Sequence, residues 1–453
     1  MSRVSGSITN VCAEGEGQKI EFKAKITALA KEMVAFANAS GGSLFLGISD
    51  DGEIVGIDDS NRLRSQIQDV ANGCDPRIDV HIVSRGNVVE IIVPEGTDKP
   101  YRCKDGFFLR IGPNSQQLNR DEILNFAIKS NKVRFDEQFE PVKNAEKLLD
   151  NDRLRAFCRR KGLPEKTLPS DLLTNLGIAQ KQQKHLLLTR TAVLFFCREP
   201  QRFLPEAFVT CALYADDTRS TVLDRVDATG TLEEQLEIVI RFIRRNLRVS
   251  YRIDQAEPRE EVQEIPEAVF REALLNALTH RDYFADTEHI FVHMHPGRMV
   301  ITSPGGLPQG LTLEELGTRS VPRNRLIADM FHRMGYVERL GSGIHRMREA
   351  MVAAHLPAPK FLPTANAFLV ENFTSFEAAG VSSEGAKLCR WLIPHGPASM
   401  QDIMGIFHFS KTTAHRRITK LMADGWIEVR GSGRNTKYVL STDYGYSGKK
   451  EER

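Results

Sequence analysis

Two polar stretches divide the chain of 453 residues into three segments, and this division constrains the fold more than any other feature of the sequence. A charged and polar stretch lies at about 135–150, and a Ser/Gly-rich stretch begins at Val381. Each segment has the length of a typical domain or of a small one, and each carries patterns typical of both helices and strands. We therefore predict a multidomain α+β protein with domains at residues 1–135, 150–372 and 381–442.

The charge of the chain is distributed unevenly between these segments. The whole sequence has 61 Lys and Arg against 59 Asp and Glu, a net charge of +2. Residues 381–453 alone contain 12 basic and 7 acidic side chains, a net charge of +5, which leaves 49 against 52, or −3, for the rest. A locally basic segment is the usual mark of nucleic-acid binding, so the charge directs attention to the C-terminal segment.

Several classes of protein are excluded by patterns that the sequence lacks. The seven cysteines are scattered without the spacing of a zinc site, and the N-terminus has no apolar signal-peptide core. The longest apolar run is shorter than the roughly 18 residues of a membrane-spanning helix. A phosphate loop of the GxxxxGK[ST] type is missing, which excludes a P-loop motor. We expect a soluble cytoplasmic protein without a membrane partner, and we expect it to form a homo-oligomer.

Acidic residues near the N-terminus form a candidate metal site. Glu16 and Glu21 lie five residues apart, Lys23 follows two residues later, and Asp50 and Asp51 lie in the turn of a predicted hairpin. Three convergent carboxylates can hold a divalent cation that activates water, and a lysine can stabilise the developing charge on a phosphate. From the spacing alone, surface charges and ordinary turn chemistry are the favoured interpretation.

Further motifs follow these acidic residues in a fixed order. They are Ala35-Phe36-Ala37-Asn38 with Gly41-Gly42, Leu44-Phe45-Leu46-Gly47-Ile48, Lys99-Pro100-Tyr101, and Phe107 with Arg110-Ile111-Gly112. Over about residues 10–130 this order resembles the Schlafen-type AlbA-like domain. The resemblance implies nucleic-acid binding, and some members of the family cut structured RNA such as tRNA with a three-carboxylate metal site. Many other relatives are DNA-binding regulators.

Carried over by motif, the resemblance places the catalytic residues of such a nuclease in this chain. It implies Mg²⁺ or Mn²⁺ as the metal and Asp51 as the alternative third ligand. The catalytic residues are Glu16, Glu21, Asp50 and Lys23, of which the three acidic residues are also the metal ligands.

A candidate nucleotide site lies in the second segment. The run 271–277 reads as a helix, on which Glu272 and Asn276 share one face because they lie four residues apart. The run 300–308 reads as a strand that ends in a Gly/Pro turn, and Gly341-Ser342-Gly343-Ile344 opens a second helix, whose free N–H groups could receive a phosphate. Taken alone, Glu272 and Asn276 fit an ordinary amphipathic helix better than a site.

With Arg323–Ala328 and Gly335–Glu338 between them, these motifs resemble a divergent GHKL-type ATPase domain, best matched over about 265–350. The resemblance implies an α/β sandwich that binds ATP, with Asn276 also holding the metal. Ser303 lies near the place where the family has an aspartate that reads the adenine. Helicase activity is not expected, because the motor motifs are missing. The implied nucleotide-binding residues are Glu272, Asn276, Gly305, Gly306, Gly341 and Gly343.

Two short patterns in the same segment are given less weight. His280-Arg281-Asp282 spells a kinase tripeptide, but the partner motifs of a kinase are missing. His293 and His295 alternate along a predicted strand, and without a third ligand nearby we interpret them as a surface pair rather than a metal site.

The third segment predicts a winged helix-turn-helix. Helices are expected over 386–393, 400–407 and 411–424, the last with a Ser N-cap, followed by a hairpin formed by 426–430 and 437–440. In this fold the third helix enters the DNA major groove, and the wing contacts the backbone. A role in protein contacts or dimerisation is the alternative. The candidate nucleic-acid-binding residues are Lys411, Thr412, Thr413, His415, Arg416, Lys420, Arg434 and Lys437.

The modules together indicate a nucleotide-responsive protein that binds nucleic acid, either RNA, including tRNA, or DNA. The leading hypothesis adds metal-dependent endonuclease activity, with phage defence as the setting that the resemblance implies. The alternative is a non-catalytic, ATP-binding transcriptional regulator that binds DNA. A third hypothesis is an ATPase whose nucleic-acid modules serve only for targeting.

Overall fold

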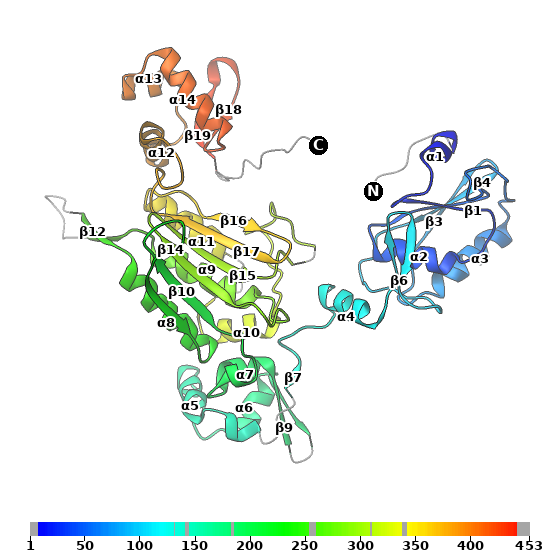
Figure 1. The fold of residues 1–453 in the computed structure, drawn as a ribbon, viewed down its shortest axis with the longest axis horizontal. Coiled ribbons are helices and arrows are strands. Elements are labelled where there is room, and N and C mark those ends of the chain that lie inside the picture. The colour runs from blue at the N-terminus through cyan, green and yellow to red at the C-terminus, as the bar shows by residue number, and fades with distance from the viewer. Residues whose placement is uncertain are drawn as a thin grey trace. The chain divides into compact units, whose positions relative to one another are not determined.

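The structure is a computed structural model, and it describes residues 8–130, 132–140, 145–182, 185–252, 260–308, 310–337 and 342–441. Its internal contacts group the chain into two compact units, Met1–Val133 and Arg134–Arg453. The second unit contains both the segment resembling an ATPase and the basic C-terminal segment, and the division into three domains stays a prediction. Mixed helices and sheets in both units confirm the expected α+β fold class (Figure 1).

The first unit is built on a four-stranded sheet with the order β1-β2-β4-β3, drawn in blue to cyan in Figure 1. β1 and β2 are parallel, and the other two pairs are antiparallel. The strands are β1 (Ile20–Lys23), β2 (Gly42–Leu46), β3 (His81–Arg85) and β4 (Val88–Val93), with the hairpin β5 (Phe108–Ile111) and β6 (Asn114–Gln117). The helices are α1 (Ile8–Glu14), α2 (Leu29–Asn38), α3 (Asn61–Asn72) and α4 (Arg120–Lys129).

Alternation along β1 determines which side chains face each side of this sheet. Ile20 and Phe22 join the small apolar cluster that also includes residues of α1. Glu21 and Lys23 point to the opposite face, because successive side chains of a strand alternate. Their partners in the register, Leu44 and Leu46, belong to the larger core under α2 and α3. The sequence thus directs a carboxylate and an ammonium group into the side of the sheet that carries the main core.

One predicted hairpin differs in the structure. Residues 44–46 and 54–55 were expected to pair as strands, but Ile54 forms only an isolated bridge with Ile48. β2 lies in the middle of the sheet and pairs with β1 and β4 instead. Its residues from Ser43 to Leu46 are buried, as expected of a central strand.

The second unit begins with a small α+β region around a three-stranded sheet of order β7-β9-β8. Its elements are β7 (Phe139–Glu140), η1 (Ala145–Leu148), α5 (Asn151–Arg160), α6 (Pro169–Asn175), β8 (Ala179–Gln182), β9 (His185–Thr189), α7 (Arg190–Phe196) and η2 (Pro200–Arg202).

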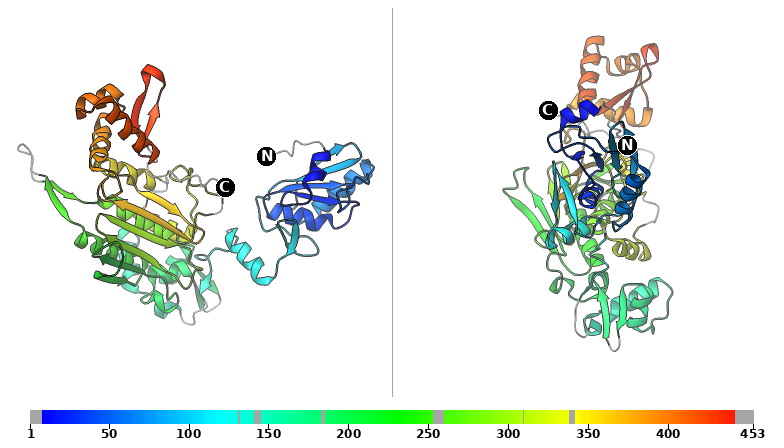
Figure 2. Two further views of the ribbon diagram at one scale, coloured as in Figure 1. Left: turned by 45° about the horizontal axis from the view of Figure 1, so that its top comes forward. Right: turned by 90° about the vertical axis from the view of Figure 1, so that its right-hand side faces the viewer.

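A six-stranded sheet with the order β11-β10-β14-β15-β17-β16 forms the centre of the second unit (Figures 1 and 2). Ile290, Val292 and Met294 alternate along β14 into the core that α8 and α9 share with the sheet. The strands are β10 (Val209–Tyr214), β11 (Val222–Ala228), β14 (Ile290–His295), β15 (Arg298–Pro304), β16 (Lys360–Pro363) and β17 (Ala367–Phe373). The further elements are α8 (Leu232–Asn246), β12 (Val249–Arg252), β13 (Glu260–Gln263), α9 (Glu267–His280), α10 (Arg325–Arg333) and α11 (Gly343–Ala353).

His293 and His295 share one face of β14, as predicted, but they are not a surface pair. Their exposed fractions are only 8% and 6%. Tyr214 on the neighbouring strand β10 stacks on the His295 ring at 5.0 Å and packs edge-on against His293 at 5.6 Å. Aromatic cover from an adjacent strand, which the local pattern does not reveal, buries both rings.

The C-terminal segment has three helices followed by an antiparallel pair of strands, drawn in orange to red in Figure 1. This is the element order expected above for a winged helix-turn-helix. Its own apolar core includes Leu388, Leu392, Ile418 and Trp426. Ser410 accepts a hydrogen bond from the backbone N–H of Thr413, which confirms the predicted N-cap. The elements are α12 (Ser383–His395), α13 (Met400–Phe407), α14 (Lys411–Ala423), β18 (Ile427–Arg430), η3 (Gly433–Asn435) and β19 (Lys437–Leu440).

Among the residues that the structure describes, no helix combines the length and the apolar character needed to cross a membrane.

Candidate nucleotide and nucleic-acid sites

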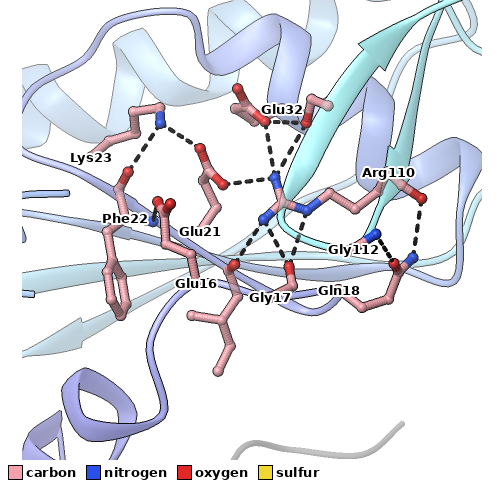
Figure 3. A network of polar contacts seen from close by, with 11 residues as sticks. Glu16, Gly17, Gln18, Glu21, Phe22, Lys23, Glu32, Arg110 and Gly112 are labelled. Atoms are coloured by element: carbon pink, nitrogen blue, oxygen red, sulfur yellow. Dashed lines mark hydrogen bonds and ion pairs between the residues drawn. The ribbon is translucent and has the colours of Figure 1, made fainter. Parts of the chain in front are cut away.

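A buried arginine occupies the centre of the acidic cluster in the first unit (Figure 3). The Arg110 side chain, on β5, is fully shielded from solvent, and its guanidinium lies 2.7 Å from the Glu21 carboxylate. A second carboxylate, that of Glu32 on α2, lies 3.5 Å from the same nitrogen. The other guanidinium nitrogens donate to the backbone carbonyls of Gly17 and Ile20. Arg110 therefore ties β1, α2 and the preceding loop together as an internal cation.

Lys23 completes this network from the other side of Glu21. Its ammonium group donates to one oxygen of the Glu21 carboxylate, while Arg110 faces the other oxygen (Figure 3). Burial alone would lower the pKa of Lys23, but the hydrogen bond to Glu21 and the charges of Glu21, Glu32 and Glu16 outweigh this effect and raise the pKa. Lys23 is therefore charged at neutral pH.

The predicted metal ligands do not fit a divalent cation in this arrangement. Both oxygens of Glu21 already face cationic groups, and a metal bound there would be repelled by the Arg110 charge. Glu16 instead accepts a hydrogen bond from the backbone N–H of Phe22, and Asp50 is exposed in the turn after β2. In the described parts of the chain, no group of three or more His, Cys, Asp or Glu side chains could hold a metal ion. The expected assembly of Glu16, Glu21 and Asp50, or of Asp51 in its place, is not formed here.

The second unit contains a cavity of about 680 Å³ between α9, β15, the loop that follows β15, α10 and α11. Five of the six predicted nucleotide-binding residues line it, although they come from three separate stretches of sequence. Gly341 lies outside the described residues. The predicted residues that line the cavity are Glu272, Asn276, Gly305, Gly306 and Gly343.

All three of these glycines lie where a larger residue does not fit. A Cβ atom on Gly305 would lie 2.7 Å from the Cβ atom of Asp282. A Cβ atom on Gly306 would lie 2.4 Å from the backbone carbonyl oxygen of Thr364. A Cβ atom on Gly343 would lie 2.6 Å from the Glu272 carboxylate, which is itself held by Arg346 at 2.6 Å. The absence of a side chain lets the cavity loop pack against the segment between β16 and β17, and lets the start of α11 pack against α9.

The electrostatics of the cavity are set by groups at the end of α9. Burial lowers the pKa of His280 to about 4, with a further contribution from Arg323, so this ring is neutral at neutral pH. Arg323 donates to the Gly306 carbonyl at 2.6 Å and lies 3.5 Å from Asp282. Ser303 donates to the Ala277 carbonyl at 3.1 Å. Of the His280-Arg281-Asp282 tripeptide, His280 lines this cavity.

Charged residues of α10 and of the loop before it also line the cavity, and the sequence analysis did not select them. Arg325, Asp329 and Arg333 follow one another at intervals of four residues, so they share one face of the helix. Arg319 approaches from the preceding loop. The regular spacing of charges on α10 was the signal that could have revealed this face.

The predicted nucleic-acid contacts lie mostly on the open surface of the C-terminal segment. Thr413 is half-buried, Lys437 lies 3.7 Å from Asp402, and the side chain of Arg434 is outside the described residues. Arg417, next to the predicted Arg416, instead pairs with Glu384 at 3.2 Å and covers the Phe409 ring at 4.1 Å. The exposed predicted residues are Lys411, Thr412, His415, Arg416, Lys420 and Lys437.

Comparison with known proteins bears on both units. Residues 16–119 match the family model described as "Schlafen, AlbA_2". The first unit contains a Schlafen AlbA_2 domain. Residues 287–371, which include β14, β15, α10, α11, β16 and most of β17, match the family model described as "Putative ATP-dependent DNA helicase recG C-terminal". The second unit thus contains an ATPase-like domain, and the predicted resemblances of both segments are confirmed.

A matching solved structure is the crystal structure of the DIP2311 protein from Corynebacterium diphtheriae. It is 18% identical, the match covers 96% of both chains, and the TM-score is 0.47. No curated protein gives a match to this chain.

Proposed function

We propose that this protein is a nucleotide-responsive nucleic-acid-binding protein. A nucleoside triphosphate binds in the cavity of the ATPase-like domain, and nucleic acid binds to the Schlafen AlbA_2 domain and to the C-terminal helices. The observation that carries the proposal is the convergence of Glu272, Asn276, Gly305, Gly306 and Gly343 around one cavity. Its volume of about 680 Å³ lies within the range of small-molecule and cofactor sites.

The lining of the cavity suits the parts of ATP. Arg325 offers a cationic group for the phosphates, and the Asn276 side chain offers an oxygen for Mg²⁺. Arg319 and Arg333 also line the cavity, and a phosphate would replace their present partners, Glu315 and Asp329. Ile301 and Val370 provide an apolar wall for the base. A bound triphosphate supplies a strongly charged ligand, and its hydrolysis would return the cavity to the state without triphosphate. Hydrolysis by this protein stays a prediction.

For the Schlafen AlbA_2 domain we propose binding without metal-dependent cutting. The pairing of Glu21 with Arg110 and Lys23 favours this non-catalytic alternative over the endonuclease hypothesis, because the carboxylate most needed for a metal is already neutralised. Endonuclease activity on RNA or tRNA and a role in phage defence stay predictions from the resemblance. Transcriptional regulation is the function that binding without cutting would serve.

The C-terminal helices supply a second nucleic-acid surface in this proposal. Lys411, Arg416 and Lys420 are exposed on α14, where their charges can meet phosphates. Such contacts give salt-dependent affinity. They orient the protein on nucleic acid but carry little sequence information.

Isothermal titration calorimetry of ATP with Mg²⁺ against the full chain tests the nucleotide site. We expect the wild type to bind and Asn276→Ala to lose at least about tenfold in affinity, the effect of one charge-assisted interaction. Glu267→Gln is the matched control, because Glu267 lies on the same helix α9 and does not line the cavity. No binding by the wild type, or equal affinity of wild type and Asn276→Ala, would contradict the proposed site.

A further inference from the structure

An aspartate far away in the sequence caps the helix that lines the cavity. Asp136 is fully buried, and one oxygen of its carboxylate accepts hydrogen bonds from the backbone N–H groups of Leu326 at 2.6 Å and Ile327 at 3.4 Å. These residues are the second and third of α10. Their N–H groups have no acceptor within the helix, so the Asp136 carboxylate acts as an N-cap supplied by another part of the chain.

The residue at the usual N-cap position of α10 is engaged elsewhere. Asn324 makes no capping hydrogen bond to α10. It is 1% exposed, and its amide donates to the carbonyls of Thr279 and Arg281 at 2.8 Å each. Asn324 therefore ties the start of α10 to the end of α9, and Asp136 is left to cap the helix.

The capped helix lies between the core and the cavity. Ile327 and Phe331 pack inward and are fully buried, whereas Arg325, Asp329 and Arg333 line the cavity. A ligand that pulls on these charged side chains therefore acts on a helix whose N-terminus is held by Asp136. A displacement of α10 must change the two hydrogen bonds to Asp136, because they join the helix to a separate segment.

The segment that carries Asp136 begins the second unit. The first unit ends at Val133, and only Arg134 and Phe135 separate it from Asp136. The Phe135 ring stacks on Tyr283 at 5.3 Å, and Tyr283 follows three residues after His280, which lines the cavity. The Asp136 backbone carbonyl accepts a hydrogen bond from Thr191 at 2.8 Å. The chain that leads to the Schlafen AlbA_2 domain is thus anchored directly on the elements that form the nucleotide cavity.

We propose that Asp136 is the residue that couples nucleotide binding to nucleic-acid binding: a nucleoside triphosphate in the cavity moves α10, and the Asp136 cap passes this change to the segment that joins the two units. This inference rests on the proposed function and names its regulation. Asp136 is a positioning residue in this account, since it touches α10 and not the nucleotide.

The coupling is measured as the ratio of two dissociation constants. Fluorescence anisotropy gives the affinity for a labelled DNA duplex and for a labelled single-stranded RNA of the same sequence, with and without a saturating non-hydrolysable ATP analogue. For the probe that the wild type binds more tightly, we expect a ratio in the range of about 5 to 150, as for typical allosteric coupling. Asp136→Ala is expected to reduce the ratio to about 1 while both ligands still bind.

Asp150→Ala is the matched control. Asp150, the partly exposed N-cap residue of α5 itself, also accepts from the N–H groups of the second and third residues of its helix, Asp152 at 3.0 Å and Arg153 at 3.3 Å, but α5 does not line this cavity. If loss of a helix cap only loosened the protein, both variants would reduce the ratio. The proposal requires that Asp150→Ala keep the wild-type ratio.

Each outcome decides the inference. A wild-type ratio in Asp136→Ala, with the fold intact by circular dichroism, overturns it. If Asp136→Ala does not fold, Asp136→Asn replaces it, since the amide keeps an acceptor but loses the charge; a reduced ratio supports the inference and an unchanged one contradicts it. If the wild type binds both ligands and neither changes the affinity for the other, the coupling is contradicted while the proposed binding sites are not. A wild type that binds no ATP analogue refutes the proposed function itself.

Discussion

The guanidinium of Arg110 lies 2.7 Å from the carboxylate of Glu21 inside the first unit, and neither side chain is more than 6% exposed. A buried ion pair of this kind stabilises the folded domain only while both charged side chains are present. Removing one partner leaves an uncompensated charge in the interior. The same pairing that stabilises the domain removes Glu21 from the role of a metal ligand.

Arg110→Ala is therefore expected to destabilise the protein by about 3–5 kcal/mol, because Glu21 and Glu32 would be left without their shared cation. Urea denaturation measures this loss. Arg102→Ala is the control: Arg102 pairs with Asp75 at 3.1 Å, both side chains are more than half exposed, and the expected loss is at most about 1 kcal/mol. Equal losses in the two variants would refute the structural role of Arg110.

Divalent metals are expected to leave the first unit unaffected. Without nucleotide, adding Mn²⁺ or Mg²⁺ to the chelator-treated protein should not raise its melting temperature. Among the described residues of the first unit no carboxylates are grouped for a metal, and a ligand stabilises only by binding the folded state. Glu21→Gln serves as the comparison. A metal-dependent rise in the melting temperature that Glu21→Gln abolishes would restore the metal site.

Gly306→Ala is expected to weaken ATP binding at least about tenfold, because its Cβ would meet the backbone of Thr364 and force the cavity loop to shift. Calorimetry with ATP measures the change. Gly310→Asn is the control in the same loop: a Cβ at Gly310 meets no atom within 4 Å, and Asn tolerates the positive φ of 78° found there. Equal binding by wild type and Gly306→Ala would show that the loop does not shape the site.

Stability should fall in acid partly because of His293. Burial, with smaller contributions from Arg219 and His295, lowers the pKa of His293 from 6.5 to about 4. As the pH falls from about 6.5 to about 4, the unfolded chain binds this proton and the folded chain does not, so the free energy of unfolding decreases. His293→Phe should remove about 1–3 kcal/mol of this decrease. Urea denaturation at several pH values measures the free energy of unfolding. If it falls equally with pH in the wild type and in His293→Phe, His293 does not cause the decrease.

The exposed arginine of α14 should affect nucleic-acid binding but not stability. Arg416→Ala is expected to weaken DNA binding and to reduce the slope of log K against log salt by about 0.9, the loss of one phosphate contact. Its neighbour provides the comparison, since Arg417 packs on Phe409 and pairs with Glu384. Arg417→Ala should lower the melting temperature instead. An unchanged salt slope in Arg416→Ala would exclude this helix from the interface.

Local patterns predicted much of what is needed to place the nucleotide cavity. The helix that carries Glu272 and Asn276 follows from apolar spacing, and the glycines of 305–306 and 343 follow from their turn and helix-start positions. These signals are written in a few neighbouring residues. For that reason the structure contains the helix and the turns that these residues predict.

Other features depend on contacts between distant segments, which no local pattern encodes. The family resemblance places Glu21 among the metal ligands, whereas its partner in the structure, Arg110, lies on a strand much later in the chain. Asp136 lies in the polar stretch that separates the first two predicted domains, although its carboxylate caps a helix 190 residues away. Both carboxylates have partners that only the tertiary structure identifies.

The most direct test of the central claim is the affinity of the wild-type protein for nucleic acid with and without ATP. Fluorescence anisotropy with a labelled DNA duplex at fixed salt and Mg²⁺ is sufficient, once calorimetry has shown that the cavity is saturated. The account predicts that ATP changes the dissociation constant by at least about fivefold. An identical dissociation constant in the presence of bound ATP would contradict it.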